Sequence, residues 1–188
     1  MANVIIISGS PTPGSRLNGL IQFSEAKLKE LGHEVVHLQV ADLPAEDLIK
    51  ANFGSPAIVA AQAQVAAADA VIIASPVYKA SFTGVLKTFL DLIPQKGFQN
   101  KTIVPLFIGG TIAHLLAIDY SLKPVAAALG ATLILNGVYA VDQWVERLEG
   151  GGFKLSEELT ERLLNTIGQL SEELKWQAQR QGAPASQA

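Results

Sequence analysis

Short apolar runs alternate along the chain with segments in which apolar residues recur at helical spacing. Five apolar runs are predicted as strands: residues 4–7, 35–40, 71–74, 103–108 and 132–135. Five segments are predicted as helices: residues 17–31, 57–68, 84–93, 113–129 and 156–180. Gly32, Pro94 and Gly130 follow three of these helices and end them, whereas Pro105 weakens the strand prediction over 103–108.

The strand runs are apolar at successive positions, so both faces of each strand are expected to be buried. This pattern is typical of a parallel sheet covered by helices on both sides, the doubly wound α/β class. Residues 1–180 are predicted to form a single domain. The polar, Pro-containing residues 181–188 are expected to form a flexible tail, and residues 150–152, all glycine, to form a loop.

Composition narrows the chemistry that the chain can perform. Its 188 residues include no Cys, which excludes disulfides, thiolate metal sites and a cysteine nucleophile. Its three His are scattered along the chain, so a histidine-rich metal centre is not expected. A net charge of -3 gives no electrostatic reason to expect nucleic acid binding. No apolar run approaches the roughly 20 residues of a membrane span, and no signal peptide is recognisable, so a cytoplasmic protein is expected. An enzyme with so few reactive side chains is expected to use a bound cofactor.

In doubly wound sheets, ligands bind beyond the carboxyl ends of the strands. The first predicted strand is followed by a Gly- and Ser-rich loop that contains Ser8, Ser10, Ser15 and Arg16. Gly9 and Gly14 have the spacing of a Walker A loop, but Ser15 stands where that motif has lysine. The G-x-G-x-x-G dinucleotide motif is also absent. The loop is therefore predicted to bind a mononucleotide phosphate, and the alternative of an ordinary turn with Ser15 as helix N-cap stays open.

Two further strand ends carry candidate binding residues. Pro76, Val77, Tyr78 and Lys79 follow the third strand, where the Tyr78 ring is suited either to a flat ligand or to plain packing. Gly109, Gly110 and Thr111 follow the fourth strand, where paired glycines allow a ligand close to the backbone or simply make a turn. The three loops are expected to meet at one edge of the sheet.

Together, residues 8–11 with 15–16, residues 76–80 and residues 109–117 resemble the NAD(P)H-dependent FMN reductase family. The likeness extends to about Ala140 and is greatest for FMN reductases of two-component alkanesulfonate monooxygenase systems. It implies a flavodoxin-like fold with a five-stranded parallel sheet in the order 2-1-3-4-5. It also implies site residues: Ser8, Ser10, Ser15, Arg16 and, less directly, Asn18 for the FMN phosphate; Pro76, Val77, Tyr78, Lys79, Gly109, Gly110 and Thr111 around the flavin ring.

The resemblance further implies that NADPH, or alternatively NADH, reduces FMN, with the hydride chemistry carried by the flavin and with no catalytic side chain or metal. Reduced FMN would pass to a flavin-dependent monooxygenase of sulfonate-sulfur assimilation. Tyr120 matches a tyrosine that is inserted in this branch, where it creates a π-bulge at a tetramer interface near the flavin. A homo-oligomer, tetramer or dimer, is therefore expected, and the apolar segment 113–129 is its predicted interface.

Three alternatives remain at this stage. The first is a quinone or azo reductase that holds FMN tightly, and the second is a flavodoxin-like electron carrier that does not use NAD(P)H. The third is a regulatory or interaction protein that binds neither nucleotide. Cations eligible to read the 2′-phosphate of NADPH are Arg16, Lys79, Lys87 and Lys123.

Overall fold

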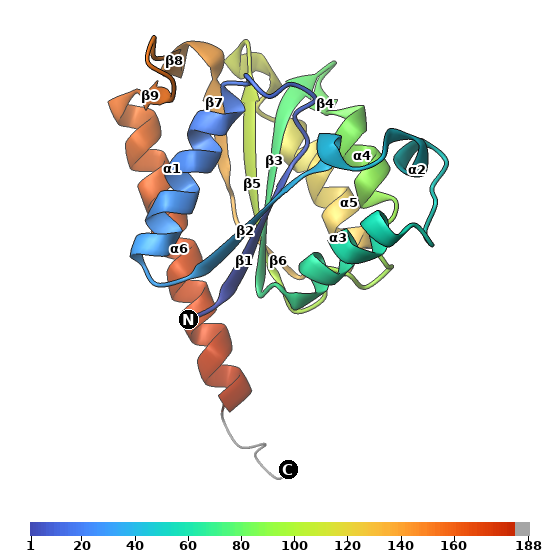
Figure 1. Ribbon diagram of the computed structural model, residues 1–188. Coiled ribbons are helices and arrows are strands. Elements are labelled where there is room, and N and C mark those ends of the chain that lie inside the picture. Colours follow the sequence, from blue (N-terminus) through green and yellow to red (C-terminus); the bar gives the residue numbers. More distant parts are fainter. Residues whose placement is uncertain (183–188) are drawn as a thin grey trace.

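A mainly parallel sheet forms the centre of the molecule, which a computed structural model describes for residues 1–182 (Figure 1). The strand order is β2-β1-β3-β5-β6. These strands are β1 (Asn3–Ser8), β2 (Glu34–Gln39), β3 (Ala70–Tyr78), β5 (Thr102–Gly109) and β6 (Leu133–Ile134). Since β5 and β6 are the fourth and fifth predicted strands, the predicted fold class and order 2-1-3-4-5 are confirmed.

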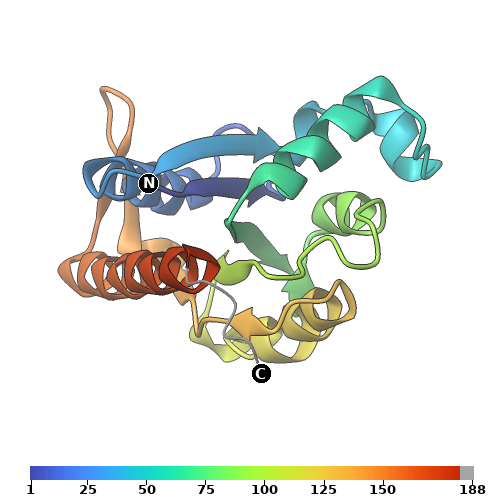
Figure 2. The same ribbon diagram turned by 90° about the horizontal axis from the view of Figure 1, so that it is seen from below.

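Helices cover both faces of the sheet (Figure 2). One face carries α1 (Leu17–Glu30) and α6 (Glu157–Gly182); the other carries α3 (Pro56–Ala67), α4 (Gly84–Leu90) and α5 (Lys123–Ala128). Successive residues of β1 point to opposite faces, so Val4 and Ile6 pack toward α1 and α6 whereas Ile5 and Ile7 pack toward α3 and α4. Both cores depend on apolar residues at every strand position, as the sequence pattern indicated.

The fifth strand position is occupied by two short strands. β6 pairs with Thr102 and Ile103, and β7 (Val138–Val141) pairs with the carboxyl-terminal half of β5. The interruption lies opposite Pro105, which has no N–H to donate, and Gly137 adopts a φ of +72° against the Pro105 carbonyl. A side chain at position 137 would overlap Pro105. The predicted last strand, residues 132–135, is therefore wrong in extent.

The sheet contains seven strands rather than the five predicted, because β7 and the short antiparallel β4 (Ser81–Phe82) join it. A separate antiparallel hairpin consists of β8 (Val145–Arg147) and β9 (Phe153–Leu155), which the sequence pattern did not indicate. Residues 150–152 lie in the turn of this hairpin, so they form a loop, as predicted.

The segment predicted as one helix over 113–129 is broken into three elements. They are a 3₁₀ turn η2 (Ile112–His114), a π-helix η3 (Ile118–Leu122) and α5. The backbone N–H of Lys123 donates to the carbonyl of Ile118, five residues earlier, which is the π-type bond. Pro124 has no N–H, so the α-helical bond from residue 124 to the carbonyl of Tyr120 cannot form.

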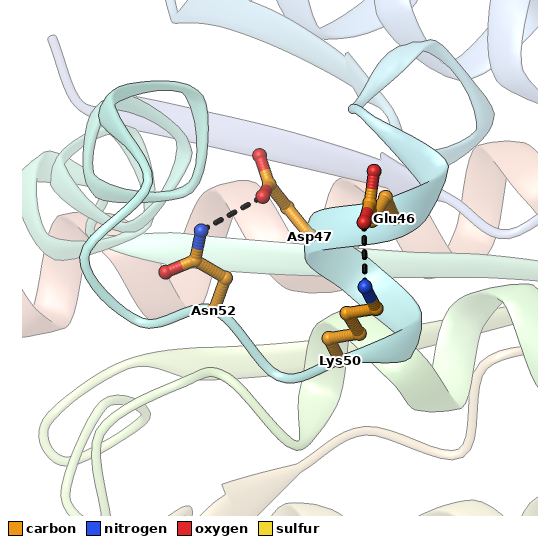
Figure 3. Close-up of polar contacts among 4 residues, drawn as sticks. All are labelled: Glu46, Asp47, Lys50 and Asn52. Carbon is orange, nitrogen blue, oxygen red and sulfur yellow. Dashed lines mark hydrogen bonds and ion pairs between the residues drawn. The ribbon is translucent and has the colours of Figure 1, made fainter.

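Short helices complete the connections. The helix α2 (Ala45–Ile49) lies between η1 (Val40–Asp42) and α3, and η4 (Asp142–Trp144) follows β7. In α2, Lys50 pairs with Glu46 at 2.6 Å and Asn52 donates to the Asp47 carboxylate at 2.8 Å (Figure 3). Ser55, at the start of α3, donates to the other oxygen of Asp47 at 2.6 Å. These bonds fix α2 against α3.

The last helix also differs slightly from its prediction. α6 continues through Gly182, two residues beyond its predicted end at Arg180, so the predicted tail over 181–188 begins too early. The rest of that tail, residues 183–188, lies outside the described residues. Within residues 1–182, no helix combines the length and the apolar character that a membrane crossing requires.

Candidate functional site

A cavity of about 190 Å³ lies at the carboxyl ends of β1, β3 and β5. Loops from three parts of the sequence line it, as the strand-end argument predicted, together with residues that follow β7. The lining residues are Thr12, Ser15, Arg16, Pro76, Val77, Tyr78, Ile108, Gly109, Gly110, Asp142 and Arg147. Seven of the predicted binding residues are therefore brought together here: Ser15, Arg16, Pro76, Val77, Tyr78, Gly109 and Gly110.

Ser8 and Ser10 are buried within the loop after β1 and do not line this cavity. The Ser10 hydroxyl donates to the Thr12 carbonyl at 3.1 Å and accepts from the Thr12 N–H at 3.3 Å. From β2, the Gln39 amide donates to the Ser10 carbonyl at 2.6 Å. The Ser10 hydroxyl therefore shapes the turn after β1, and the phosphate-binding roles of Ser8 and Ser10 stay predictions.

Ser15 and Arg16 lie at the start of α1 and face the cavity. The Ser15 hydroxyl accepts from the Leu17 N–H at 3.2 Å. The N-cap residue of α1 is nevertheless Arg16 and not Ser15, as the alternative interpretation had it. Arg16 donates from Nε to the carbonyl of Val145 at 2.9 Å. The guanidinium is thereby held at the cavity wall with its other N–H groups still available.

Asn18 lies elsewhere. Its amide donates to the Pro13 carbonyl, and it lines a separate groove of about 620 Å³ beside His37 and Gln39. This groove is on the outer side of the loop, at the β2 edge of the sheet. Asn18 follows Arg16 by two residues, and this rotation of about 200° around α1 directs it away from the cavity.

Four lining residues were not predicted: Thr12 and Ile108, which adjoin the predicted loops, and two residues from farther along the chain, Arg147 and Asp142. Arg147, from β8, donates from Nε and Nη2 to the Gly14 carbonyl at 3.0 and 2.7 Å. Asp142 lies beside Gly110, where its Oδ2 is 4.0 Å from the position that a Cβ would take. Both come from the segment after residue 140, where the sequence shows no strong pattern, so no local signal could have identified them.

The end of β3 places Tyr78 at the rim of the cavity with half of its surface exposed. It begins a two-residue hairpin turn in which Val77 pairs with Phe82 and Tyr78 pairs with Ser81. The turn residues Lys79 and Ala80 have φ values of +50° and +63°, although neither is glycine. Left-handed backbone costs non-glycine residues roughly 1–2 kcal/mol each. Strain of this kind is common where a turn fixes a functional side chain.

Lys79 itself is exposed and does not line the cavity, so its position beside the flavin ring stays a prediction. Sequence analysis also missed Thr83, which follows this hairpin. Its hydroxyl donates to the Gly9 carbonyl at 2.6 Å and accepts from the Leu86 N–H at 3.1 Å. Thr83 therefore caps α4 and holds the loop after β1, a role that its position before a helix could have suggested.

At the end of β5, Gly109 packs against Tyr139 so closely that a Cβ would overlap the phenol oxygen. The Tyr139 hydroxyl donates to the Thr111 carbonyl at 2.7 Å. Together with Trp144 and Arg162, Thr111 lines a neighbouring groove that shares Gly110 with the cavity, so its place at the flavin ring stays a prediction. Gly110, in contrast, is exposed, and a Cβ there would meet only the Asp142 Oδ2 at 4.0 Å, so its backbone stays accessible.

The π-helix η3 carries Tyr120, whose side chain is 79% exposed. Large apolar side chains just before it in sequence are also exposed: Ile112, Leu115 and Leu116. This apolar segment follows directly after the cavity residue Gly110. The predicted π-bulge is thus present at Tyr120, and its predicted role at a subunit interface remains a proposal.

Comparisons with known proteins identify relatives of this chain. The chain is 47% identical over 165 residues to an FMN reductase (NADPH) of Pseudomonas putida, covering 87% of this chain and 84% of the relative. It is 48% identical over 142 residues to an FMN reductase (NADPH) of Escherichia coli, covering 76% and 74%. The apo structure of an NADH:FMN oxidoreductase, EmoB, matches with a TM-score of 0.83 at 29% identity, covering 92% of this chain and 90% of that one.

The model of the NADPH-dependent FMN reductase family matches residues 2–146. This match includes the loops after β1, β3 and β5, so the resemblance inferred from those loops is confirmed. The chain therefore belongs to the NADPH-dependent FMN reductase family.

Proposed function

We propose that this protein is an NAD(P)H:FMN oxidoreductase that binds FMN in the strand-end cavity, with NADPH as the preferred reductant. The observation that carries the proposal is that one cavity is lined both by residues suited to a phosphate and by residues suited to a flat ring. Ser15 and Arg16 at one end suit a phosphate, and Tyr78 with Gly109 and Gly110 at the other suit a flat ring.

The residues at the phosphate end fit an anion. Hydroxyl groups and a guanidinium lie beside the first turn of α1, whose backbone N–H groups and dipole favour negative charge. Within residues 1–182, Arg16 makes no ion pair with a carboxylate. Its charge is therefore available for a ligand.

The ring end fits an aromatic ligand that must also meet a nicotinamide. Tyr78 offers an exposed ring at the rim, and Gly110 leaves the backbone open beside it. When bound, FMN supplies the hydride-accepting chemistry, and the protein contributes orientation and electrostatics. The bonds from Thr83 and Tyr139 hold the two loops in place, so this orientation does not depend on mobile side chains.

The test is oxidation of NADPH by purified protein, followed by loss of nicotinamide absorbance with and without added FMN. Rapid oxidation that requires FMN is expected, with a lower KM for NADPH than for NADH. Absence of FMN-dependent oxidation with either nucleotide would contradict the proposal. Yellow protein that reduces quinones or azo dyes faster than free FMN would favour the quinone or azo reductase, and FMN binding without NAD(P)H oxidation would favour the electron carrier.

We further propose that reduced FMN is delivered to a flavin-dependent monooxygenase of sulfonate-sulfur assimilation in the cytoplasm, and that the protein works as a tetramer or dimer. The sulfonate role rests on the resemblance described above. The exposed apolar side chains of Ile112, Leu115, Leu116 and Tyr120 support self-association, because such contiguous apolar surface is uncommon on monomers. Sedimentation velocity tests the oligomer, and coupled turnover with a sulfonate monooxygenase tests the delivery.

A further inference from the structure

The β8–β9 hairpin and the loop between β1 and α1 exchange hydrogen bonds through two arginines. Arg16 of the loop donates to the carbonyl of Val145 in the hairpin. Arg147 of the hairpin donates from two nitrogens to the carbonyl of Gly14 in the loop. Each guanidinium is therefore positioned by the backbone of the other segment, and both line the strand-end cavity.

These two guanidinium groups leave positive charge at the loop end of the cavity. In the part of the chain that the structure describes, every ion pair is made by a lysine, so neither arginine is neutralised in this way. Asp142 is the one carboxylate among the cavity-lining residues; it lies beside Gly110, after β5, and forms no ion pair with either arginine within residues 1–182. Two unpaired arginines beside the Thr12 and Ser15 side chains form a donor set suited to a phosphate dianion.

The hairpin is firmly packed where Arg147 leaves it. Gly19, in the first turns of α1, approaches so closely that a Cβ there would lie 2.9 Å from side-chain atoms of both Val145 and Phe153. The base of the hairpin is thus docked on the helix that follows the loop. Arg147 accordingly depends on a packed element rather than on a flexible loop for its position.

We propose that Arg147 is a second phosphate-binding residue, which acts with Arg16 to hold the phosphate of FMN. This inference rests on the proposed function and extends it, because Arg147 is the first residue beyond the segment 2–146 matched by the family model. A phosphate monoester occurs both in FMN and at the 2′ position of NADPH. FMN is the ligand assigned here, because the cavity that contains Arg147 continues to Tyr78 and Gly109.

The test compares flavins that differ only in their phosphate. Dissociation constants of FMN and riboflavin are measured by flavin fluorescence quenching for the wild type, Arg147→Ala and Arg147→Lys. Arg147→Ala is expected to weaken FMN binding by about 10-fold to 100-fold and to leave riboflavin binding within about 2-fold, since one charge-assisted contact is lost. Arg147→Lys is expected to lie between wild type and Arg147→Ala, because it keeps the charge without the planar fork.

Lys154→Ala serves as the matched control, because Lys154 lies opposite Glu146 in the same hairpin, carries the same charge and is absent from the cavity lining. It should leave FMN binding unchanged. An equal loss of FMN and riboflavin affinity in Arg147→Ala would show a purely structural role and overturn the inference. The inference would also be overturned if Arg147→Ala changed the ratio of the KM values for NADPH and NADH but left FMN binding unchanged. Wild-type protein that binds neither flavin would overturn the proposed function as well.

Discussion

The hydroxyl of Tyr139 donates a 2.7 Å hydrogen bond to the carbonyl of Thr111, which ties β7 to the loop after β5. Burial, with the negative charge of Asp142 adding to it, raises the pKa of Tyr139, so the hydroxyl stays a proton donor across the physiological range. The same oxygen occupies the space that a side chain at position 109 would need. One phenol group therefore fixes both the conformation of the loop and the requirement for Gly109.

Gly109→Ala is expected to destabilise the protein by about 1–3 kcal/mol, because the added methyl group overlaps the Tyr139 hydroxyl. Tyr139→Phe alone should cost about 0.5–1.5 kcal/mol through the lost hydrogen bond. The double variant should be more stable than the sum predicts, since removing the hydroxyl makes room for the methyl group. Urea denaturation of the four proteins measures this coupling. Gly110→Ala is the control, because the nearest atom to a Cβ at that position is 4.0 Å away. If the costs of Gly109→Ala and Tyr139→Phe simply added in the double variant, the proposed overlap would be contradicted.

Tyr120→Ala is expected to weaken self-association and to abolish turnover of free FMN while leaving FMN more tightly bound. The exposed phenol on the π-helix is available to a neighbouring subunit, and its removal deletes much of the apolar surface of η3. Sedimentation velocity and NADPH oxidation measure the two effects. Tyr120→Phe keeps the ring and should resemble the wild type. An unchanged mass and unchanged turnover in Tyr120→Ala would contradict the proposed interface.

Stability is expected to fall as the pH drops below about 6.5, and His33 is the reason. Its Nε2 lies 2.9 Å from the Ser171 hydroxyl, while Nδ1 is buried without a partner in residues 1–182. Burial lowers the pKa of His33 from the ordinary value of 6.5, and the N-terminal amine and Lys175 lower it further. Because the unfolded chain binds the proton more readily, the neutral imidazole stabilises the fold above pH 6.5 and that stability is lost as the pH falls toward the lowered pKa.

His33→Gln should therefore flatten the dependence of the unfolding free energy on pH below about 6.5, even if it lowers stability at pH 8. Chemical denaturation at several pH values measures this slope. His114→Gln, at an exposed position, provides the control and should keep the wild-type slope. A wild-type slope in His33→Gln would assign the acid sensitivity to other groups.

Lys101→Met is expected to destabilise the protein by about 1.5–3 kcal/mol. The buried Lys101 ammonium donates to the carbonyls of Ala66, at 2.9 Å, and Ala68, which lie at the C-terminal end of α3. Methionine fills the same space but leaves both carbonyl groups unpaired. Thermal denaturation measures the loss. Lys96→Met, at an exposed position, should change the free energy of unfolding by less than about 0.5 kcal/mol.

Local patterns predicted most of the fold. Strands such as β1 and β3 consist of consecutive apolar residues, and this property is visible in any sequence that buries both faces of a strand. The failures occur where a partner far along the chain decides the conformation. The break between β6 and β7 depends on Gly137 lying opposite Pro105, and the hairpin β8–β9 depends on packing against Gly19.

The same distinction applies to the binding site. Ser15, Arg16, Tyr78 and the glycines 109 and 110 could be predicted because a loop after a parallel strand reaches the ligand edge in every doubly wound sheet. Whether a particular side chain faces the cavity could not. The Ser10 hydroxyl bonds with Thr12 inside its own loop, and Lys79 lies in an exposed turn outside the cavity lining.

The sequence by itself thus determined the positions of most strands, the edge of the sheet where a ligand is expected and the family to which the chain is similar, since these follow from hydrophobic periodicity and from short contiguous motifs. The order of the strands was implied by that family resemblance. Only the tertiary structure brought Arg147 to Gly14, 133 residues apart in the chain, and placed Tyr139 against Gly109. Such contacts depend on how separate elements pack, and the free energy of packing is a property of both partners together. A local stretch of sequence contains only one of the two packing partners, so it cannot predict the contact.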